Sequence, residues 1–224
     1  MNYKNYILPQ IGSIERPIKL GVLISGSGSG MEALLNHQNK KKDCFHETVV
    51  VISNKAGVKG LERAQSKGIP TSVVEVQTNF EVSNLRKAHE KLIQLELEKH
   101  NVDVVILSGY MRILSPFFVE RWIGRLLNIH PSLLPKFPGA HAHEEVLTSG
   151  VNETGCTVHF VDNGVDTGPI IAQKSVKVYA NDTLNDLQER VKIQEHIIYP
   201  KVIDALCEGR LQLQPSGEVI IQGL

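Results

Sequence analysis

The sequence contains few cysteines and no long apolar run. Its three cysteines among 224 residues, Cys44, Cys156 and Cys207, lie far apart and form no Cys-x-x-Cys pair. A sparse, odd set argues against a disulfide framework and is typical of proteins in a reducing cytoplasm. No apolar stretch approaches the roughly 18 residues of a membrane span, and the first residues lack the apolar centre of a signal peptide. We therefore expect a cytoplasmic protein that does not act on a membrane.

An excess of charge of either sign is also missing. Lys plus Arg number 24 and Asp plus Glu number 24, so the formal net charge is 0. Without a net field, the chain is not drawn to nucleic acid or to an anionic membrane. A content of 42% apolar and 21% charged residues instead suits a globular protein with a substantial core.

Short apolar runs alternate with helical patterns up to residue 130. The apolar runs predict buried strands at 20–25, 49–53, 71–76, 102–108 and 126–130. The patterns between them predict helices at 31–39, 58–67, 82–100 and 115–123. This alternation predicts an α/β fold with a doubly wound, mostly parallel sheet and a Rossmann-like N-terminal half, in which chemistry gathers at the carboxyl ends of the strands. Further on, the sequence predicts strands at 155–162 and 170–178, a helix at 183–208 and a hairpin-like tail at 210–221.

Asn128 and His130 end the fifth predicted strand and precede a proline-rich loop. Residues two apart on a strand point to the same side, so a neutral amide and a titratable imidazole share one space. They are either a satisfied structural pair or the working end of an active site. Asp166 lies in a turn-rich segment, where an aspartate is most often a turn residue. If that loop folds back over His130, the carboxylate would orient the imidazole and favour its charged form.

The link between the first strand and the first helix is rich in glycine. It reads Ser25-Gly26-Ser27-Gly28-Ser29-Gly30. Glycines let backbone amides approach an anion closely, and a helix N-terminus adds a positive dipole end. The dinucleotide fingerprint, the Walker sequence and the G-x-S-x-G nucleophile elbow are all absent. A single phosphate monoester fits this loop best, and a turn without a ligand is the alternative.

Three histidines lie near these motifs. His141 and His143 form a His-x-His pair, an arrangement that can bind zinc, but no fourth ligand follows at the usual spacing. We therefore predict no metal site. His159 shares one face of its predicted strand with Thr157, and a polar face beside the candidate site indicates support for that site rather than core filling.

A glutamate interrupts the apolar face of the long C-terminal helix. At about 100° per residue, one stripe contains Leu184, Leu187, Val191, Ile198, Val202 and Leu206. Glu195 falls near the middle of this stripe. A buried glutamate is rarely tolerated without a partner. It either makes a structural hydrogen bond or awaits a cationic or amine ligand.

Together these segments resemble the phosphoribosylglycinamide formyltransferase family, the folate-dependent enzymes of purine synthesis. The resemblance covers about residues 19–213 and rests on "VLISGSGSGMEALL", "ISNKAGVKGLERA", "NIHPSLLPKFPG", "GCTVHFVDNGVDTGPIIAQ" and "RVKIQEHIIYP". It implies the formyltransferase fold. The sequence pattern itself favours one domain at 18–224 after a mobile or loosely docked arm at 1–17. Within the domain the resemblance implies a phosphate-binding half at about 18–108, a folate and catalytic half at about 109–213 and a tail at 214–224.

The resemblance also implies roles for individual residues. It implies a catalytic trio of Asn128, His130 and Asp166, and a contact from Glu195 to the substrate amine. The substrate phosphate would lie on Gly26, Ser27, Gly28, Ser29 and Gly30. Folate would lie against Met111, Arg112, Ile113, Leu114, Val165 and Asp166. His141 joins Thr157 and His159 as supporting residues. The family loop usually reads Gly-Asn-Gly-Ser-Asn, and Ser27 and Gly30 replace both asparagines here.

The implied reaction moves a formyl group from 10-formyltetrahydrofolate to the amine of glycinamide ribonucleotide, in de novo purine biosynthesis and without a metal. Asn128 and the protonated His130 would stabilise the carbonyl oxygen during the attack. Two alternatives stay open: hydrolysis of formyltetrahydrofolate, and a nucleotide-phosphate binding module without catalysis. The expected partners are therefore small molecules, and the protein is either a monomer or a homodimer.

Overall fold

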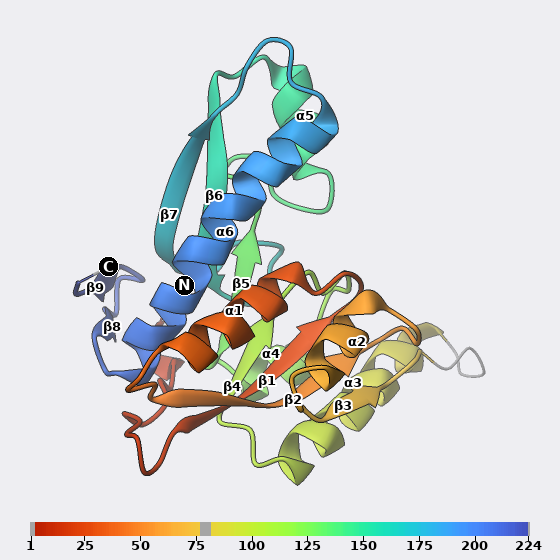
Figure 1. Ribbon diagram of the computed structural model, residues 1–224, viewed down its shortest axis with the longest axis vertical. Helices are drawn as coiled ribbons and strands as arrows, with labels where there is room; N and C mark the ends of the chain where they lie inside the picture. Colours follow the sequence, from red (N-terminus) through yellow and green to blue (C-terminus); the bar gives the residue numbers. More distant parts are fainter. Residues whose placement is uncertain (1–2, 77–81, 224) are drawn as a thin grey trace.

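A computed structural model of the chain describes residues 3–76 and 82–223 (Figure 1). Its strands are β1 (Ile18–Ile24), β2 (His46–Ser53), β3 (Thr71–Val73), β4 (Val104–Leu107), β5 (Leu126–His130), β6 (Glu153–Phe160), β7 (Ile170–Lys177), β8 (Leu211–Leu213) and β9 (Val219–Ile221). Its helices are the 3-10 turn η1 (Tyr3–Asn5) and α1 (Ser29–Lys40), α2 (Lys59–Gln65), α3 (Val82–Lys99), α4 (Pro116–Arg121), α5 (Ala142–Ser149) and α6 (Leu184–Cys207). The predicted alternation is confirmed, although β3 ends earlier than expected.

The sheet has the mostly parallel, α/β arrangement that the sequence predicts. Its strand order is β3-β2-β1-β4-β5-β6-β7, and β1 to β5 run parallel to one another. β6 pairs antiparallel with β5, and β7 pairs antiparallel with β6. The chain crosses from one side of β1 to the other between β3 and β4, which places the carboxyl ends of β1 and β4 at the switch point of the sheet.

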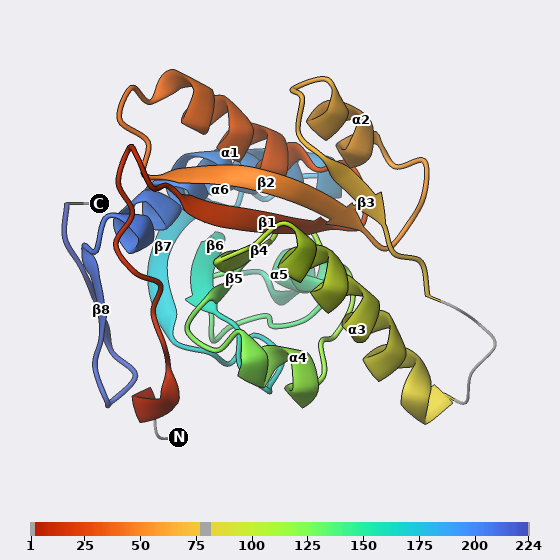
Figure 2. The ribbon, with the colours of Figure 1, turned by 90° about the horizontal axis from the view of Figure 1, so that it is seen from below.

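Helices cover both faces of the parallel strands (Figure 2). α1, α2 and α6 lie on one face, and α3 and α4 lie on the other. The strands are apolar on both faces because alternate side chains enter different cores. In β4, for example, Val104 and Ile106 pack on the α1 and α6 side, whereas Val105 and Leu107 pack on the α3 and α4 side.

The long helix α6 begins and packs as predicted. Thr183 Oγ1 accepts a hydrogen bond from the Asp186 N–H at 3.2 Å, and Asp186 Oδ2 accepts one from the Thr183 N–H at 2.9 Å. This capping box satisfies two backbone donors at the start of the helix. α6 then runs along β6 and β7, and the C-terminal part of α6 reaches α1 (Figure 1).

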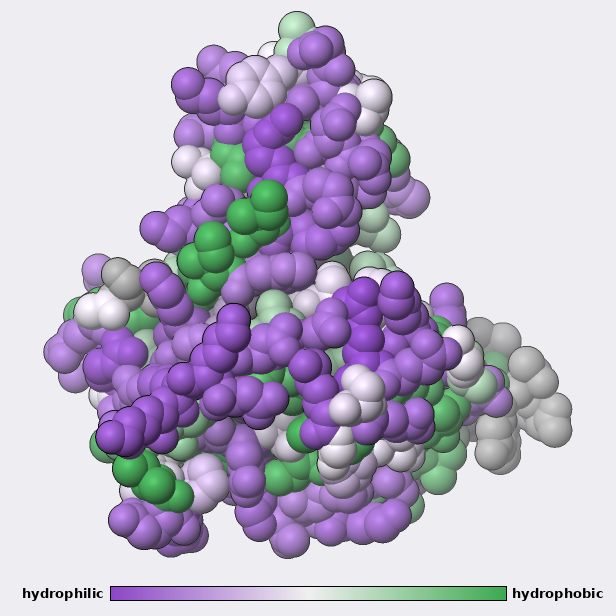
Figure 3. Space-filling view, in the orientation of Figure 1, coloured by the Kyte–Doolittle hydropathy of each residue, from purple (hydrophilic) through white to green (hydrophobic). Residues whose placement is uncertain are grey.

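The face seen in Figure 3 is mostly hydrophilic, with an apolar strip over α6. The exposed large apolar residues of α6 are Ile193 and Ile197. In the described part of the chain, no helix combines the length and the apolar character needed to cross a bilayer.

The described part of the N-terminal arm lies against the domain. The Ile7 N–H donates to Ile123 O at 3.3 Å, and the Gly12 N–H donates to Cys207 O at 2.8 Å. The Tyr6 ring meets the Phe160 ring edge-on at a centroid distance of 5.8 Å. Mobility of the arm stays a prediction, and residues 1–2 lie outside the described chain, as does residue 224 of the predicted tail.

We expect Tyr6→Ala to reduce the free energy of unfolding by about 2 kcal/mol, because it removes most of a partly buried aromatic side chain. The melting temperature should then fall by about 4–8 °C. Ile14→Ala is the matched control, since Ile14 belongs to the same arm but is 58% exposed. The control should stay within about 0.5 kcal/mol of the parent protein. Equal effects of the two substitutions would contradict docking of the arm through Tyr6.

Candidate active site

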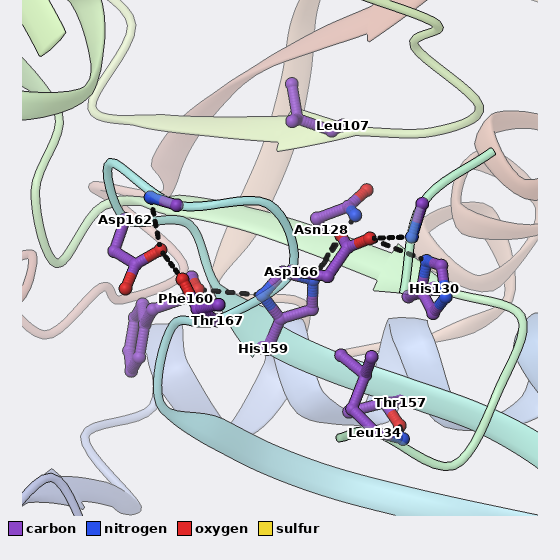
Figure 4. Close-up of polar contacts among 12 residues, drawn as sticks. Leu107, Asn128, His130, Leu134, Thr157, His159, Phe160, Asp162, Asp166 and Thr167 are labelled. Carbon is purple, nitrogen blue, oxygen red and sulfur yellow. Dashed lines mark hydrogen bonds and ion pairs between the residues drawn. The ribbon is translucent and has the colours of Figure 1, made fainter. Parts of the chain in front are cut away.

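β5 and β6 bring the predicted polar residues to one place. In the antiparallel register, Asn128 lies opposite His159 and His130 lies opposite Thr157. Directly opposite residues point to the same face of a sheet, so the four side chains share one face. Asn128 Nδ2 lies 3.3 Å from His159 Nε2 (Figure 4), a distance at which a neutral His159 ring accepts from the amide. His159 Nδ1 in turn donates to Phe160 O at 2.8 Å.

The loop between β6 and β7 brings Asp166 back over this face. Its Oδ2 lies 3.2 Å from His130 Nδ1, and its Oδ1 lies 3.5 Å from His159 Nε2 (Figure 4). The Gly139 N–H donates to Oδ2 at 2.8 Å. Asp166 adopts a left-handed backbone conformation with φ of 54°, which a non-glycine residue rarely adopts. The loop thus folds back over His130, which was the condition for a role of Asp166 at this site.

Neighbouring groups keep the Asp166 carboxylate ionised. Its partial burial alone would raise its pKa, but the contact with His159 and the hydrogen bond from the Gly139 N–H, together with the charge of His130, lower the pKa to about 2. The carboxylate can therefore accept hydrogen bonds from the imidazole throughout the neutral pH range.

Both ring nitrogens of His130 face acceptors. Nδ1 faces Asp166, and Nε2 lies 2.8 Å from Phe137 O. A protonated imidazole can donate to both of them at once. The Phe137 carbonyl belongs to the proline-rich loop, and it was not singled out from the sequence because a backbone acceptor carries no residue-type signal.

Thr157 holds the proline-rich loop in place. Its hydroxyl donates to Ser132 O at 2.6 Å and accepts from the Leu134 N–H at 3.1 Å. Gln173 Nε2 donates to Thr157 Oγ1 at 2.8 Å and to Leu134 O at 2.9 Å. Because the same loop supplies the Phe137 and Gly139 contacts, this network supports the position of His130 and Asp166.

The predicted phosphate loop connects β1 to α1. Gly28 precedes α1 with φ of 65°, and a Cβ there would lie 2.8 Å from Gly60 Cα, so only glycine fits. A Cβ on Gly30 would lie 2.8 Å from Ser108 Oγ, so a side chain there would require that hydroxyl to rotate away. The loop leads into the N-terminus of α1, a 12-residue helix, and such a terminus favours an anion.

A cavity of about 120 Å³ opens beside Asn128 and Asp166. Five of the six predicted folate residues line it: Arg112, Ile113, Leu114, Val165 and Asp166. The sixth, Met111, does not; its side chain is 71% exposed and its N–H donates to Ser25 Oγ. Tyr110, within the stretch 108–114 that the resemblance places on the folate wall, also lines the cavity. Leu107 lines it too and was not predicted, since it reads as an ordinary core residue in the sequence.

Glu195 occupies the apolar face of α6, as predicted. Five apolar residues of the same helix stripe are buried: Leu187, Val191, Ile198, Val202 and Leu206. Among the described residues, none donates a hydrogen bond to its carboxylate. Burial raises the pKa of Glu195 to about 7, and the charge of Lys192 only partly opposes this shift. The carboxyl group therefore changes charge near neutral pH.

The two histidines of the His-x-His pair occupy different places. His141 is exposed before α5, and no contact between its side chain and the trio appears in the described part of the chain. His143 is less exposed, and its Nδ1 is buried without a hydrogen-bond partner. Burial lowers the His143 pKa, and the charge of His130 lowers it further. His143 therefore interacts electrostatically with His130, and the supporting role of His141 stays a prediction.

We expect Asp166→Asn to remove a pH-dependent part of the stability. The folded-state pKa of Asp166 is about 2, below its ordinary value of 3.8, so its contribution is present above about pH 4 and is lost as the pH falls toward 2. The contribution is at most about 2 kcal/mol. Urea unfolding at pH 6 and at pH 2.5 measures it. A difference between the two proteins that does not change with pH would contradict this role of the carboxylate.

The chain matches the model of the formyl transferase family over residues 18–203. The phosphoribosylglycinamide formyltransferase of Escherichia coli strain K12 is 46% identical over 198 residues, which cover 88% of this chain and 90% of that protein. The crystal structure of glycinamide ribonucleotide transformylase 1 from Symbiobacterium toebii superposes with a TM-score of 0.87 at 40% identity, over 92% of this chain and 95% of that one. The predicted formyltransferase fold is thereby confirmed.

Some relatives are much longer. The trifunctional purine biosynthetic protein adenosine-3 of Chironomus tentans is 47% identical over 201 residues, which cover 89% of this chain but 14% of that protein. The chain thus spans a small part of the trifunctional relatives and almost all of the Escherichia coli protein.

Proposed function

This chain belongs to the formyl transferase family, and on that premise we propose that it transfers a formyl group from 10-formyltetrahydrofolate to the amine of glycinamide ribonucleotide. The proposal rests above all on one observation: Asn128, His130 and Asp166 converge at strand ends beside a cavity. The substrates are those in the names of its bacterial relatives, a folate-derived donor being typical of the family.

Asn128 stabilises the developing oxyanion. When the amine attacks the formyl carbon, negative charge grows on the carbonyl oxygen, and a preorganised N–H donor lowers the energy of that state. The Asn128 amide nitrogen now faces His159 Nε2 at 3.3 Å, a long hydrogen bond. The amide can therefore give up this contact for the formyl oxygen at little cost.

His130 supplies the proton. Its Nε2 donates to Phe137 O, so the proton available to the substrate is the one on Nδ1, which faces Asp166 at 3.2 Å. The ionised Asp166 accepts a hydrogen bond from this nitrogen and fixes the orientation of the ring. The proton finally reaches the departing tetrahydrofolate nitrogen, so the reaction needs no covalent intermediate on the enzyme.

The glycine loop and Glu195 bind opposite ends of the ribonucleotide. The loop holds the phosphate on the backbone amides of residues 26–30 and the N-terminus of α1. Glu195 accepts a hydrogen bond from the glycinamide amine. A carboxyl group with a pKa of about 7 also suits the proton that the amine loses during the attack.

Wider expectations accompany this proposal. We place the folate along Met111, Arg112, Ile113, Leu114, Val165 and Asp166. Thr157, His159 and His141 are supporting residues, and no metal takes part in the transfer. We propose a cytoplasmic monomer or homodimer with one catalytic domain at 18–224 after an arm at 1–17.

One assay distinguishes the proposed transfer from the two rival functions. A formyltetrahydrofolate hydrolase would consume the donor with water alone, and a binding module would not consume it at all. We expect donor loss only when glycinamide ribonucleotide is present. Loss of donor at an equal rate without the amine would instead establish hydrolysis.

We expect Asn128→Ala to lower turnover by about 10²–10³, the usual loss for one oxyanion donor, while the dissociation constants of both substrates change little. Steady-state kinetics and calorimetric titration measure the two quantities. Turnover within a few-fold of the parent protein would assign Asn128 a structural role.

We expect Glu195→Gln to weaken ribonucleotide binding by about 10- to 100-fold, since a charge-assisted hydrogen bond contributes about 1.5–3 kcal/mol, and to leave folate binding unchanged. In the parent protein, ribonucleotide affinity should decrease more steeply below about pH 7 than in the variant, because Glu195 with its pKa of about 7 becomes neutral there. Glu189→Gln, an exposed glutamate of the same helix, is the matched control and should behave like the parent. Equal losses for both ligands, with a lower melting temperature, would mark Glu195 as structural.

A further inference from the structure

A second polar cluster lies where α1, β2 and α6 meet. It contains a thiol, an imidazole and a carboxylate: Cys44 from the α1–β2 connection, His46 from the start of β2 and Asp204 from α6. One ligand atom from each residue lies within 4.8 Å of the others. His46 Nε2 lies 2.9 Å from Asp204 Oδ1, and the His46 side chain is fully buried.

The two oxygens of Asp204 have different surroundings. Oδ1 faces only His46 among the described contacts, whereas Oδ2 accepts from His37 Nε2 at 2.8 Å and from Lys41 Nζ at 3.0 Å. Lys41 also pairs with Glu208. An ion bound at Oδ1 would therefore leave the bonds at Oδ2 intact, as is usual for a carboxylate held by outer partners.

The surroundings of His46 can support either tautomer. Its Nδ1 lies 2.8 Å from Gln38 Nε2, and Gln38 Oε1 accepts from Thr48 Oγ1 at 3.0 Å. If the Gln38 amide turns over, its oxygen accepts from the Nδ1–H and its nitrogen donates to the Thr48 hydroxyl, because that hydroxyl can both donate and accept. His46 Nε2 then has a free lone pair directed toward Asp204 Oδ1 and Cys44.

From this geometry we propose that Cys44 Sγ, His46 Nε2 and Asp204 Oδ1 form a binding site for Zn²⁺. Thiolate, imidazole and carboxylate are the three ligand types that zinc prefers, and water completes a tetrahedral set. The ion takes the position of the proton between His46 and Asp204. The Cys44 proton is released to solvent, so the thiolate and Asp204 together balance the two charges of the ion.

The Cys44 thiol is held next to the other two groups, since its Sγ donates to His46 O at 3.1 Å. The site lies away from the candidate active site. His46 is the first residue of β2, at the amino edge of the sheet, whereas Asn128 and His130 lie at the carboxyl end of the parallel strand β5. A bound ion therefore joins the α1–β2 connection, β2 and α6 and takes no part in the formyl transfer.

Metal titration of the full chain tests this site. We expect calorimetry to detect one Zn²⁺ per chain, and Co²⁺ to produce the absorption band of a thiolate ligand. Cys44→Ser should abolish that band and weaken Zn²⁺ binding by more than the 10- to 100-fold that is typical for loss of an outer partner. Zn²⁺ should raise the melting temperature of the parent protein more than that of the variant.

Matched variants identify the ligands. Cys156→Ala removes a thiol that lies in the core, and His100→Gln removes an imidazole near the end of α3; both should keep the cobalt band. Gln38→Ala should weaken binding without removing the thiolate band, since it touches only the outer partner of His46. Cys44 lies outside the helices and strands, so we expect Cys44→Ser to keep the fold. A thermal melt of the variant verifies this. Absence of saturable Zn²⁺ binding, or a cobalt band that survives Cys44→Ser, would overturn the proposal.

Discussion

The antiparallel pairing of β5 with β6 is the constraint on which the candidate active site depends. In this register Asn128 faces His159 and His130 faces Thr157, so one face of two strands carries four polar side chains. A slip of one residue would turn all the side chains of one strand to the opposite face. The same pairing leads the chain from β6 into the loop that returns Asp166 to His130. The register of β5 and β6 therefore decides whether the three residues of the trio lie close together.

The sequence predicted most of the fold because the local signals agree with one another. β4 and β5 are short apolar runs buried on both faces, and α6 combines a capping box at Thr183 with a long apolar stripe. Asn128 and His130 could be paired from period-two geometry alone. Glu195 stood out because a carboxylate interrupts that stripe, and its position on α6 was therefore predictable before any resemblance was considered.

Contacts between distant parts of the chain leave no local pattern in the sequence. Gly139 and Asp166, 27 residues apart, are joined by a backbone donor that no residue-type pattern reveals. His46 and Asp204 are separated by 158 residues, so the cluster with Cys44 exists only once α6 has packed against α1 and β2. The His-x-His pair, with one residue between its histidines, is visible in the sequence as a possible metal site. The proposed zinc ligands Cys44, His46 and Asp204 are not, because they converge in space rather than in sequence.

Two carboxyl groups of this protein illustrate how environment divides their chemical roles. Asp166 contacts His159 and His130 and receives a hydrogen bond from the Gly139 N–H, and its pKa falls to about 2. Glu195 lies partly buried on an apolar helix face with no hydrogen-bond donor in the described chain, and desolvation raises its pKa to about 7. The first group is therefore a permanent anion that orients a neighbour, and the second can gain or lose a proton near neutral pH. Divergent pKa values of this kind distinguish a carboxyl group that stays ionised from one that can exchange a proton. The proposed transfer needs one group of each kind, because it must both orient an imidazole and remove a proton from an amine.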